Sequence, residues 1–155
     1  MTNERQTLLR AAMAAVRKCA DTMEDQAERL RVALPDVATN KELRATAHEL
    51  SAGLKDTSGR VNFELALLQT ELGEGKADAT TVMRALARME ATMMGALDGV
   101  ADLVDRLEGA AEQDESCEPA FVLVIEAAGV MLQSFENAKA ATQALGAAMA
   151  AAEGT

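Results

Sequence analysis

His48 is the only histidine in the chain, and among its side chains the imidazole is best suited to accept a phosphoryl group. Lys41 and Lys55 each stand seven residues from it, which places all three on one face of a helix, away from the apolar seam. An exposed histidine on a helical bundle could therefore act in phosphotransfer. An ordinary surface histidine has the same pattern, and we favour that interpretation.

The residues around His48 resemble the histidine-phosphotransfer domain family. That family carries leucine two residues after its histidine, lysine three residues after it and glycine four residues after it. Leu50 matches this pattern, whereas Ser51 and Ala52 stand where the lysine and the glycine would be. The resemblance covers one or two helical turns. It implies a signalling protein with His48 as phosphoacceptor, which we keep as the alternative hypothesis.

A series of carboxylates could in principle bind a cation. Asp98, Asp102 and Asp105 share one face of a predicted helix, and the acidic character continues from Glu108 to Glu118. The chain has no Asp-x-Asp-x-Asp-Gly loop, and one histidine cannot supply the two Glu-x-x-His pairs of a di-iron bundle. We therefore expect a solvated charged face with no metal. A docking surface for a basic partner is the second interpretation.

The sequence gives no support for covalent catalysis or for a cofactor. Cys19 and Cys117 have no recognisable base or oxyanion loop, and the Gly73–Lys76 turn lacks the strand that precedes a phosphate-binding loop. In a bundle, the two cysteines would lie roughly 20 Å apart along the axis, so we expect free thiols. We expect a protein that is not an enzyme and has no cofactor.

Composition favours a helical protein and narrows its partners. The 155 residues are 49% hydrophobic but include no Trp or Tyr and only three Phe, which argues against a sheet. The net charge of −10 disfavours nucleic acids and anionic membranes. The longest apolar run, 119–132, contains Glu126 and is short for a membrane span. We predict a cytoplasmic protein, and its alanine and arginine usage suggests a bacterial source.

Apolar residues at alternating steps of four and three predict long helices that pack side by side, as in a coiled coil. Three segments carry such a seam without interruption. Their seam residues are Leu9, Met13, Val16, Ala20, Met23, Ala27, Leu30 and Leu34; then Val82, Leu86, Met89, Met93, Ala96, Val100, Leu103 and Leu107; and finally Phe121, Val124, Ala128, Met131, Phe135, Ala138, Thr142, Leu145 and Met149.

The predicted fold is all-α, an antiparallel up-down-up-down four-helix bundle that forms a single domain over residues 1–155. Short connections with turn and capping residues separate the helices, including Thr39 or Asn40, Asp78 or Thr80, and Ser116. The alanine-rich end of the last helix is expected to fray. The predicted helices span residues 3–34, 40–72, 78–110 and 117–150.

The second predicted helix is the least regular of the four. Its seam runs from Leu43 to Thr57, and then continues from Val61 to Leu72 after an extra step. Residues 56–60 have turn chemistry inside the helical pattern. We therefore expect a packing adjustment near residues 56–60, with a kink or a full break into two helices as alternatives.

Apolar residues outside the seams predict a surface for association. The start of the fourth predicted helix is apolar nearly all the way round, and the second helix has an apolar pair one turn apart off its seam. Because symmetric dimers are common, we expect homo-oligomerisation slightly ahead of coverage within the monomer. The candidate partner-binding residues are Phe63, Leu67, Val122, Leu123 and Val130.

The resulting expectation is a protein–protein interaction module, either an adaptor, a regulator or a secretion-type chaperone. Its length, acidity and helicity are similar to those of the small helical chaperones of flagellar and type III export. A third hypothesis is a carrier for a small molecule or lipid, which requires a cavity inside the bundle. Such a cavity would lie between Met89, Met93, Met131 and Phe135.

Overall fold

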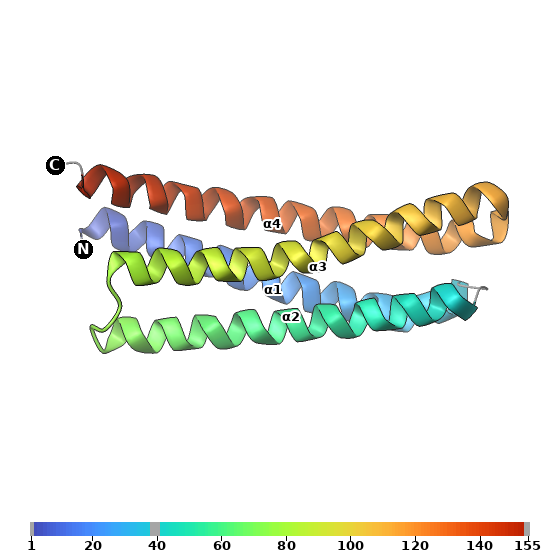
Figure 1. Ribbon diagram of the computed structural model, residues 1–155, viewed down its shortest axis with the longest axis horizontal. Coiled ribbons are helices and arrows are strands. Elements are labelled where there is room, and N and C mark those ends of the chain that lie inside the picture. The colour runs from blue at the N-terminus through green and yellow to red at the C-terminus, as the bar shows by residue number, and fades with distance from the viewer. Residues whose placement is uncertain (1, 38–40, 154–155) are drawn as a thin grey trace.

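The computed structural model describes residues 2–37 and 41–153, and it confirms an all-α four-helix bundle (Figure 1). The helix ends fall within three residues of the predicted ends. A short 3-10 turn, η1, precedes the last helix. The elements are α1 (Asn3–Val37), α2 (Lys41–Gly73), α3 (Ala79–Gln113), η1 (Glu115–Cys117) and α4 (Glu118–Glu153).

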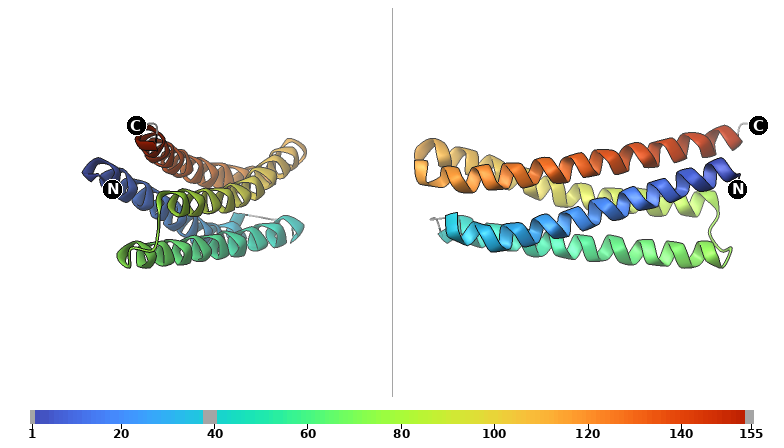
Figure 2. Two further views of the ribbon diagram at one scale, coloured as in Figure 1. Left: turned by 60° about the vertical axis from the view of Figure 1, so that its left-hand side comes forward. Right: turned by 180° about the vertical axis from the view of Figure 1, so that it is seen from behind.

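The helices run up and down, and each packs against the next one in the chain, with α4 closing the ring against α1. Figure 2 shows the same arrangement from two other sides. The α1–α4 contact is the most extensive, whereas α2 and α3 form the least extensive contact between neighbours. Because the number of helices is even, α1 begins at the end of the bundle where α4 finishes (Figure 1).

The predicted seams form the core. Every seam residue of α1 is buried, as is nearly every seam residue of α3 and α4. Ala96, Phe121 and Ala128 are the partly exposed members. Leu145 and Met149 are buried and α4 remains helical to Glu153, so the alanine-rich end is packed rather than frayed in this structure.

The alternative of a full break in α2 is wrong, because α2 is one continuous helix from Lys41 to Gly73, and the expected slip in its seam is wrong as well. Its buried positions keep alternating steps of four and three, with Ser51 and Ser58 at two core positions. The apolar pattern of the sequence shifts here because these serines are polar, and Leu50 and Thr57 beside them continue the apolar spacing instead. The buried residues are Ala47, Ser51, Leu54, Ser58, Val61, Leu65 and Leu68.

Small polar residues in the core of α2 join it to α1. The Ser51 hydroxyl donates to the Ala27 carbonyl oxygen at 2.7 Å, and the Ser58 hydroxyl lies 3.5 Å from a Glu24 carboxylate oxygen. These hydrogen bonds satisfy hydroxyl groups that would otherwise be costly to bury. A serine also takes little room, which lets the two helices approach closely.

Local signals explain the start of α3 and the turn before α4. Asp78 caps α3, since its carboxylate accepts from the Thr81 N–H at 2.8 Å, and this lowers the pKa of Asp78. Gly75 has a φ of 70°, a conformation that glycine adopts readily, in the turn before α3. Ser116 is not the cap of α4: its N–H and hydroxyl both donate to Asp114 at the start of η1. The predicted caps Thr39 and Asn40 lie outside the described residues.

Candidate functional site

Large apolar side chains are exposed on the outside of α4, where a bundle helix normally carries polar residues. The exposed fractions are 43% for Val122, 44% for Ile125, 45% for Val130 and 51% for Leu132. Each is far more exposed than Val124 and Met131 on the core side of the same helix, which are fully buried. The first half of α4 is therefore apolar toward solvent as well as toward the core.

Three of these side chains, those of Val122, Ile125 and Leu132, belong to a regular stripe along α4, which we call the α4 outer stripe. Its members follow steps of three and four, as the core seam does, and all of them are exposed or partly exposed. Because such residues line one side of a helix, the stripe is a second seam that faces away from the core. It consists of Val122, Ile125, Gly129, Leu132, Glu136, Lys139, Gln143, Gly146 and Ala150.

A second apolar surface lies on α2. Phe63 is 65% exposed and Leu67 is 48% exposed, one turn apart, and we call this pair the α2 patch. Because α2 and α4 lie diagonally across the bundle, the structure separates the α2 patch from the α4 outer stripe. The five predicted contact residues therefore do not form one site.

Leu123 and Val130, which are seven residues apart, lie on the side of α4 that faces α1, whereas Val122 belongs to the α4 outer stripe. Leu123 is half-buried, whereas Val122 and Val130 are exposed. A groove of about 620 Å³ runs here between the two helices, and acidic residues stand along it. Glu126 at this groove forms an ion pair with Arg29 of α1, with 3.2 Å between the charged groups.

Sequence reasoning missed Ile125 and Leu132 as individual contact candidates. Both are exposed, and both belong to the α4 outer stripe. The sequence does contain the signal. Residues 122, 125, 129 and 132 repeat at the same steps as the core seam, on a different face of the same helix. Met94 on α3 is 40% exposed and adds apolar surface, whereas its neighbour Met93 is fully buried.

Another groove lies between α2 and α3, the neighbouring helices with the least extensive contact. This groove has a volume of about 710 Å³ and is lined largely by small residues, including Gly53, Gly95 and Gly99. A Cβ atom at Gly99 would lie 3.4 Å from the Leu50 side chain, so glycine brings α2 close at that point. Charged residues of both signs, such as Arg60 and Asp102, border the groove.

His48 is exposed on α2, as the sequence analysis expected. It lines a small hollow of about 40 Å³ together with Arg31 and Arg44. Arg31 is engaged by Glu28, which also pairs with Lys55 at 2.9 Å. The hollow is too small for more than one water-sized group.

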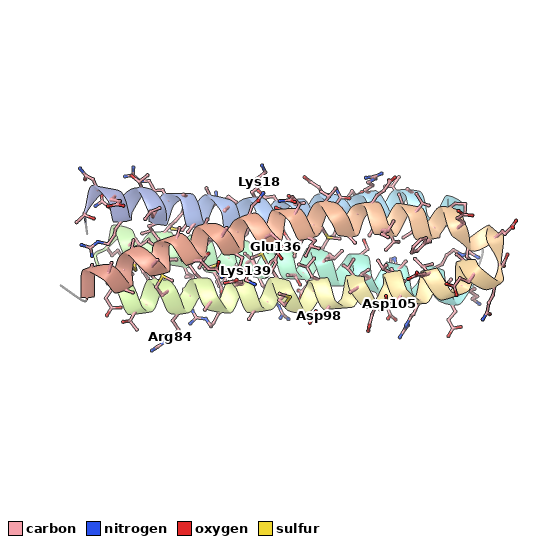
Figure 3. All side chains as sticks on the ribbon, turned by 90° about the horizontal axis from the view of Figure 1, so that it is seen from above. Lys18, Arg84, Asp98, Asp105, Glu136 and Lys139 are labelled. Carbon is pink, nitrogen blue, oxygen red and sulfur yellow. The ribbon has the colours of Figure 1, made fainter. Side chains whose placement is uncertain are left out.

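The acidic series on α3 is a solvated face. Asp98, Asp102 and Asp105 are all exposed, and Figure 3 shows Asp98 and Asp105 pointing outward. Within the described ranges, no three His, Cys, Asp or Glu side chains gather closely enough to hold a metal ion.

Both cysteines are buried and free, so the expected absence of a disulfide between them is confirmed. Burial raises the pKa of Cys19 to about 11, and a hydrogen bond with Ser134 offsets part of this shift. The thiolate of Cys19, which is the nucleophilic form, is therefore strongly disfavoured at neutral pH.

The positions that a carrier would need to leave open are filled with side chains. Met89, Met93 and Met131 are fully buried, and Phe135 is 1% exposed. All four belong to one core cluster with residues of α1 and α2. Their place in the structure is that of ordinary core residues.

Comparison with protein-family models, with curated proteins and with solved structures gives no match. The functional argument for this chain therefore depends on its own surfaces.

The stretch Glu115–Ala152 is long and apolar enough to cross a membrane, judged by length and composition alone. Most of this hydropathy comes from the apolar run 119–132, which by itself is short for a membrane span and contains Glu126. Core helices of soluble proteins pass the same test, and α4 does carry core residues. Only 28% of its most apolar window is buried, however, which agrees with the exposure of the α4 outer stripe.

Proposed function

We propose that this chain is a non-enzymatic protein-interaction module that acts in the cytoplasm as an adaptor, a regulator or a secretion-type chaperone. It would bind through the apolar outer faces of its helices, with a second copy of itself among its partners. The α4 outer stripe would be the main contact, and the α2 patch would serve a further partner.

The observation that carries this proposal is the exposure of Ile125 and Leu132 on a helix whose opposite face is already fully packed. Each leaves a large aliphatic surface in water, at a cost of about 25 cal/mol for every Å² of apolar area left uncovered. Contiguous apolar surface of this kind is typical of sites that bind another macromolecule. The net charge of −10 favours solubility and would steer basic partners toward the module.

The test compares the two surfaces by charge insertion. The variants Leu132→Glu on α4 and Phe63→Glu on α2 alter exposed positions, so both should keep the helical circular dichroism and the thermal stability of the wild type. We expect light scattering and co-purification to show that at least one variant loses a partner, either another copy or a different protein. Wild-type-like binding by both variants would contradict the proposal.

The exposure of His48 beside Arg44 favours a second candidate function, that of a phosphotransfer protein. A guanidinium near the histidine could stabilise the charge of a phosphoryl group. The test is incubation with phosphorylated response regulators, with His48→Gln as the control. Label that appears on the wild type and not on the variant would support this candidate, and the absence of label on His48 would end it.

A further inference from the structure

We propose that the α4 outer stripe is covered by the same stripe of a second copy, in an antiparallel pairing about a two-fold axis at the level of residues 137 and 138. This inference rests on the proposed function and names its partner and its register. It follows from three features of the stripe: its spacing, the distribution of its side-chain sizes and the position of its charges.

The spacing of the stripe suits a helix pair. Alternating steps of three and four keep nine residues on one side of α4 from Val122 to Ala150, which is eight turns of helix. In an antiparallel pair of such seams, residues meet when their numbers add to a constant. A sum of 275 matches eight of the nine members of the stripe with one another, and Val122 alone lies beyond these pairs. The resulting pairs are Ile125 with Ala150, Gly129 with Gly146, Leu132 with Gln143, and Glu136 with Lys139.

Side-chain size differs between the two halves of the stripe. The large aliphatic residues Val122, Ile125 and Leu132 stand in the first half, and small residues such as Gly146 and Ala150 stand in the second. The second half also borders a groove of about 500 Å³ between α3 and α4, which Met83 and Met149 line. An antiparallel two-fold axis brings the protruding half of one copy onto the hollow half of the other, so Ile125 of each copy would enter this groove.

Charge favours the same arrangement. Glu136 and Lys139 lie near the middle of α4 (Figure 3), and neither forms an ion pair with another described residue. In the proposed pairing, Glu136 of each copy faces Lys139 of the other, which gives two ion pairs at the centre. A parallel pairing in the same register would instead place Glu136 against Glu136 and Lys139 against Lys139.

Other antiparallel registers lose these ion pairs. A sum lower by one heptad places Glu136 against Leu132 and Lys139 against Gly129. A sum higher by one heptad places Glu136 against Gly146 and Lys139 against Gln143. Each of these alternatives buries charged groups beside apolar or uncharged ones, which is costly. The charges therefore select one register from the set that the spacing allows.

Met94 of α3 adds apolar surface at the centre of the proposed interface. Gly146 on α4 lies beside Met83 on α3, since a Cβ atom at Gly146 would be 3.2 Å from the Met83 side chain. That contact places Met94 level with residue 135, close to the proposed axis. Its exposed thioether could adapt to the partner's surface there.

A charge-swap series tests the proposal. We measure the dimer dissociation constant by sedimentation for the wild type, Glu136→Lys, Lys139→Glu and the double swap. Each single reversal sets like charges against each other at both central positions, so dimerisation should weaken at least about tenfold. The double swap restores opposite charges and should recover most of the affinity. Leu132→Glu should abolish the dimer, and circular dichroism should show that all variants keep the wild-type helicity.

Three results would overturn this inference, and each has a different consequence for the proposed function. A dimer that Phe63→Glu disrupts and Leu132→Glu does not would move the interface to the α2 patch. The register would be refuted if Leu132→Glu disrupts the dimer but the double swap does not recover the affinity that the single charge reversals lose. A monomer that binds phosphatidylcholine vesicles, with binding lost in Leu132→Glu, would assign the stripe to a lipid surface, and the proposed function would then be judged by the Phe63→Glu variant alone.

Discussion

The Ser51 hydroxyl on α2 donates a 2.7 Å hydrogen bond to the Ala27 carbonyl oxygen on α1, inside the core. Both side chains are small and buried, so the backbones of these two helices come close together at this level. A larger side chain at either position would push the helices apart. The contact therefore sets the local spacing of the α1–α2 pair.

Replacing Ser51 tests this relationship. We expect Ser51→Ala to lower the free energy of unfolding by about 1 kcal/mol through loss of the hydrogen bond, and Ser51→Leu to lower it by about 1–3 kcal/mol through overpacking. Ala52 is the matched control because it is the next residue and is exposed. Ala52→Leu should leave stability within about 0.5 kcal/mol in a urea titration. A stabilising Ser51→Leu would show that the core has room there.

The adjacent methionines Met93 and Met94 should respond in opposite ways to truncation. Met93 is fully buried, so Met93→Ala should cost about 2–5 kcal/mol from lost burial and the cavity left behind. Met94 is 40% exposed, so Met94→Ala should change monomer stability by no more than about 0.5 kcal/mol. Chemical denaturation of the two variants side by side checks this, and equal losses would contradict the assigned helix phase.

The buried thiol of Cys19 should make stability fall at alkaline pH. Its pKa is about 11 in the folded chain, against an ordinary value of 9.0, so the unfolded chain releases this proton first. Its contribution is fully present below pH 9 and is lost as the pH rises toward 11, by up to about 3 kcal/mol. Comparing the wild type with Cys19→Ala across this range isolates the effect from other groups. Parallel curves for the two proteins would count against it.

Glu28 should titrate at unusually low pH. Hydrogen bonds from Arg31 and Lys55 lower the pKa of this exposed carboxyl group to about 2, from an ordinary value of 4.5. Its contribution to stability is therefore present above pH 4.5 and is lost as the pH falls toward 2. NMR titration of the side-chain carboxyl carbon should show this value, and Arg31→Met should raise it. A pKa near 4.5 in the wild type would mean that the ion pair is broken in solution.

The sequence predicted the helices and most of the core because both depend on one repeating signal. Residues such as Leu86 and Phe135 occupy core positions at helical spacing and are buried as expected. The prediction failed for Ser51 and Ser58, where a polar residue occupies a core position. Whether a serine is buried depends on how close a second helix comes and on whether a carbonyl oxygen is within hydrogen-bonding distance. Neither can be predicted from the sequence of one helix.

The candidate surface was harder to predict than the core. The apolar start of α4 was evident, but the choice among Val122, Leu123 and Ile125 required knowing which side of α4 faces α1 and which faces α3. In an isolated helix these sides are equivalent. The order of the helices around the bundle removed that equivalence, leaving Leu123 half-buried and Ile125 exposed.

The start of α1 and the end of α4 share one end of the bundle, and the turn between α2 and α3 lies there too (Figure 1). A short linker could thus join residue 153 to residue 3, while new ends are opened at Gly75 in that turn. Such a circular permutant would keep every helix and every interhelical contact. Two chains could equally be fused in tandem from this end, leaving the long sides of both rods accessible.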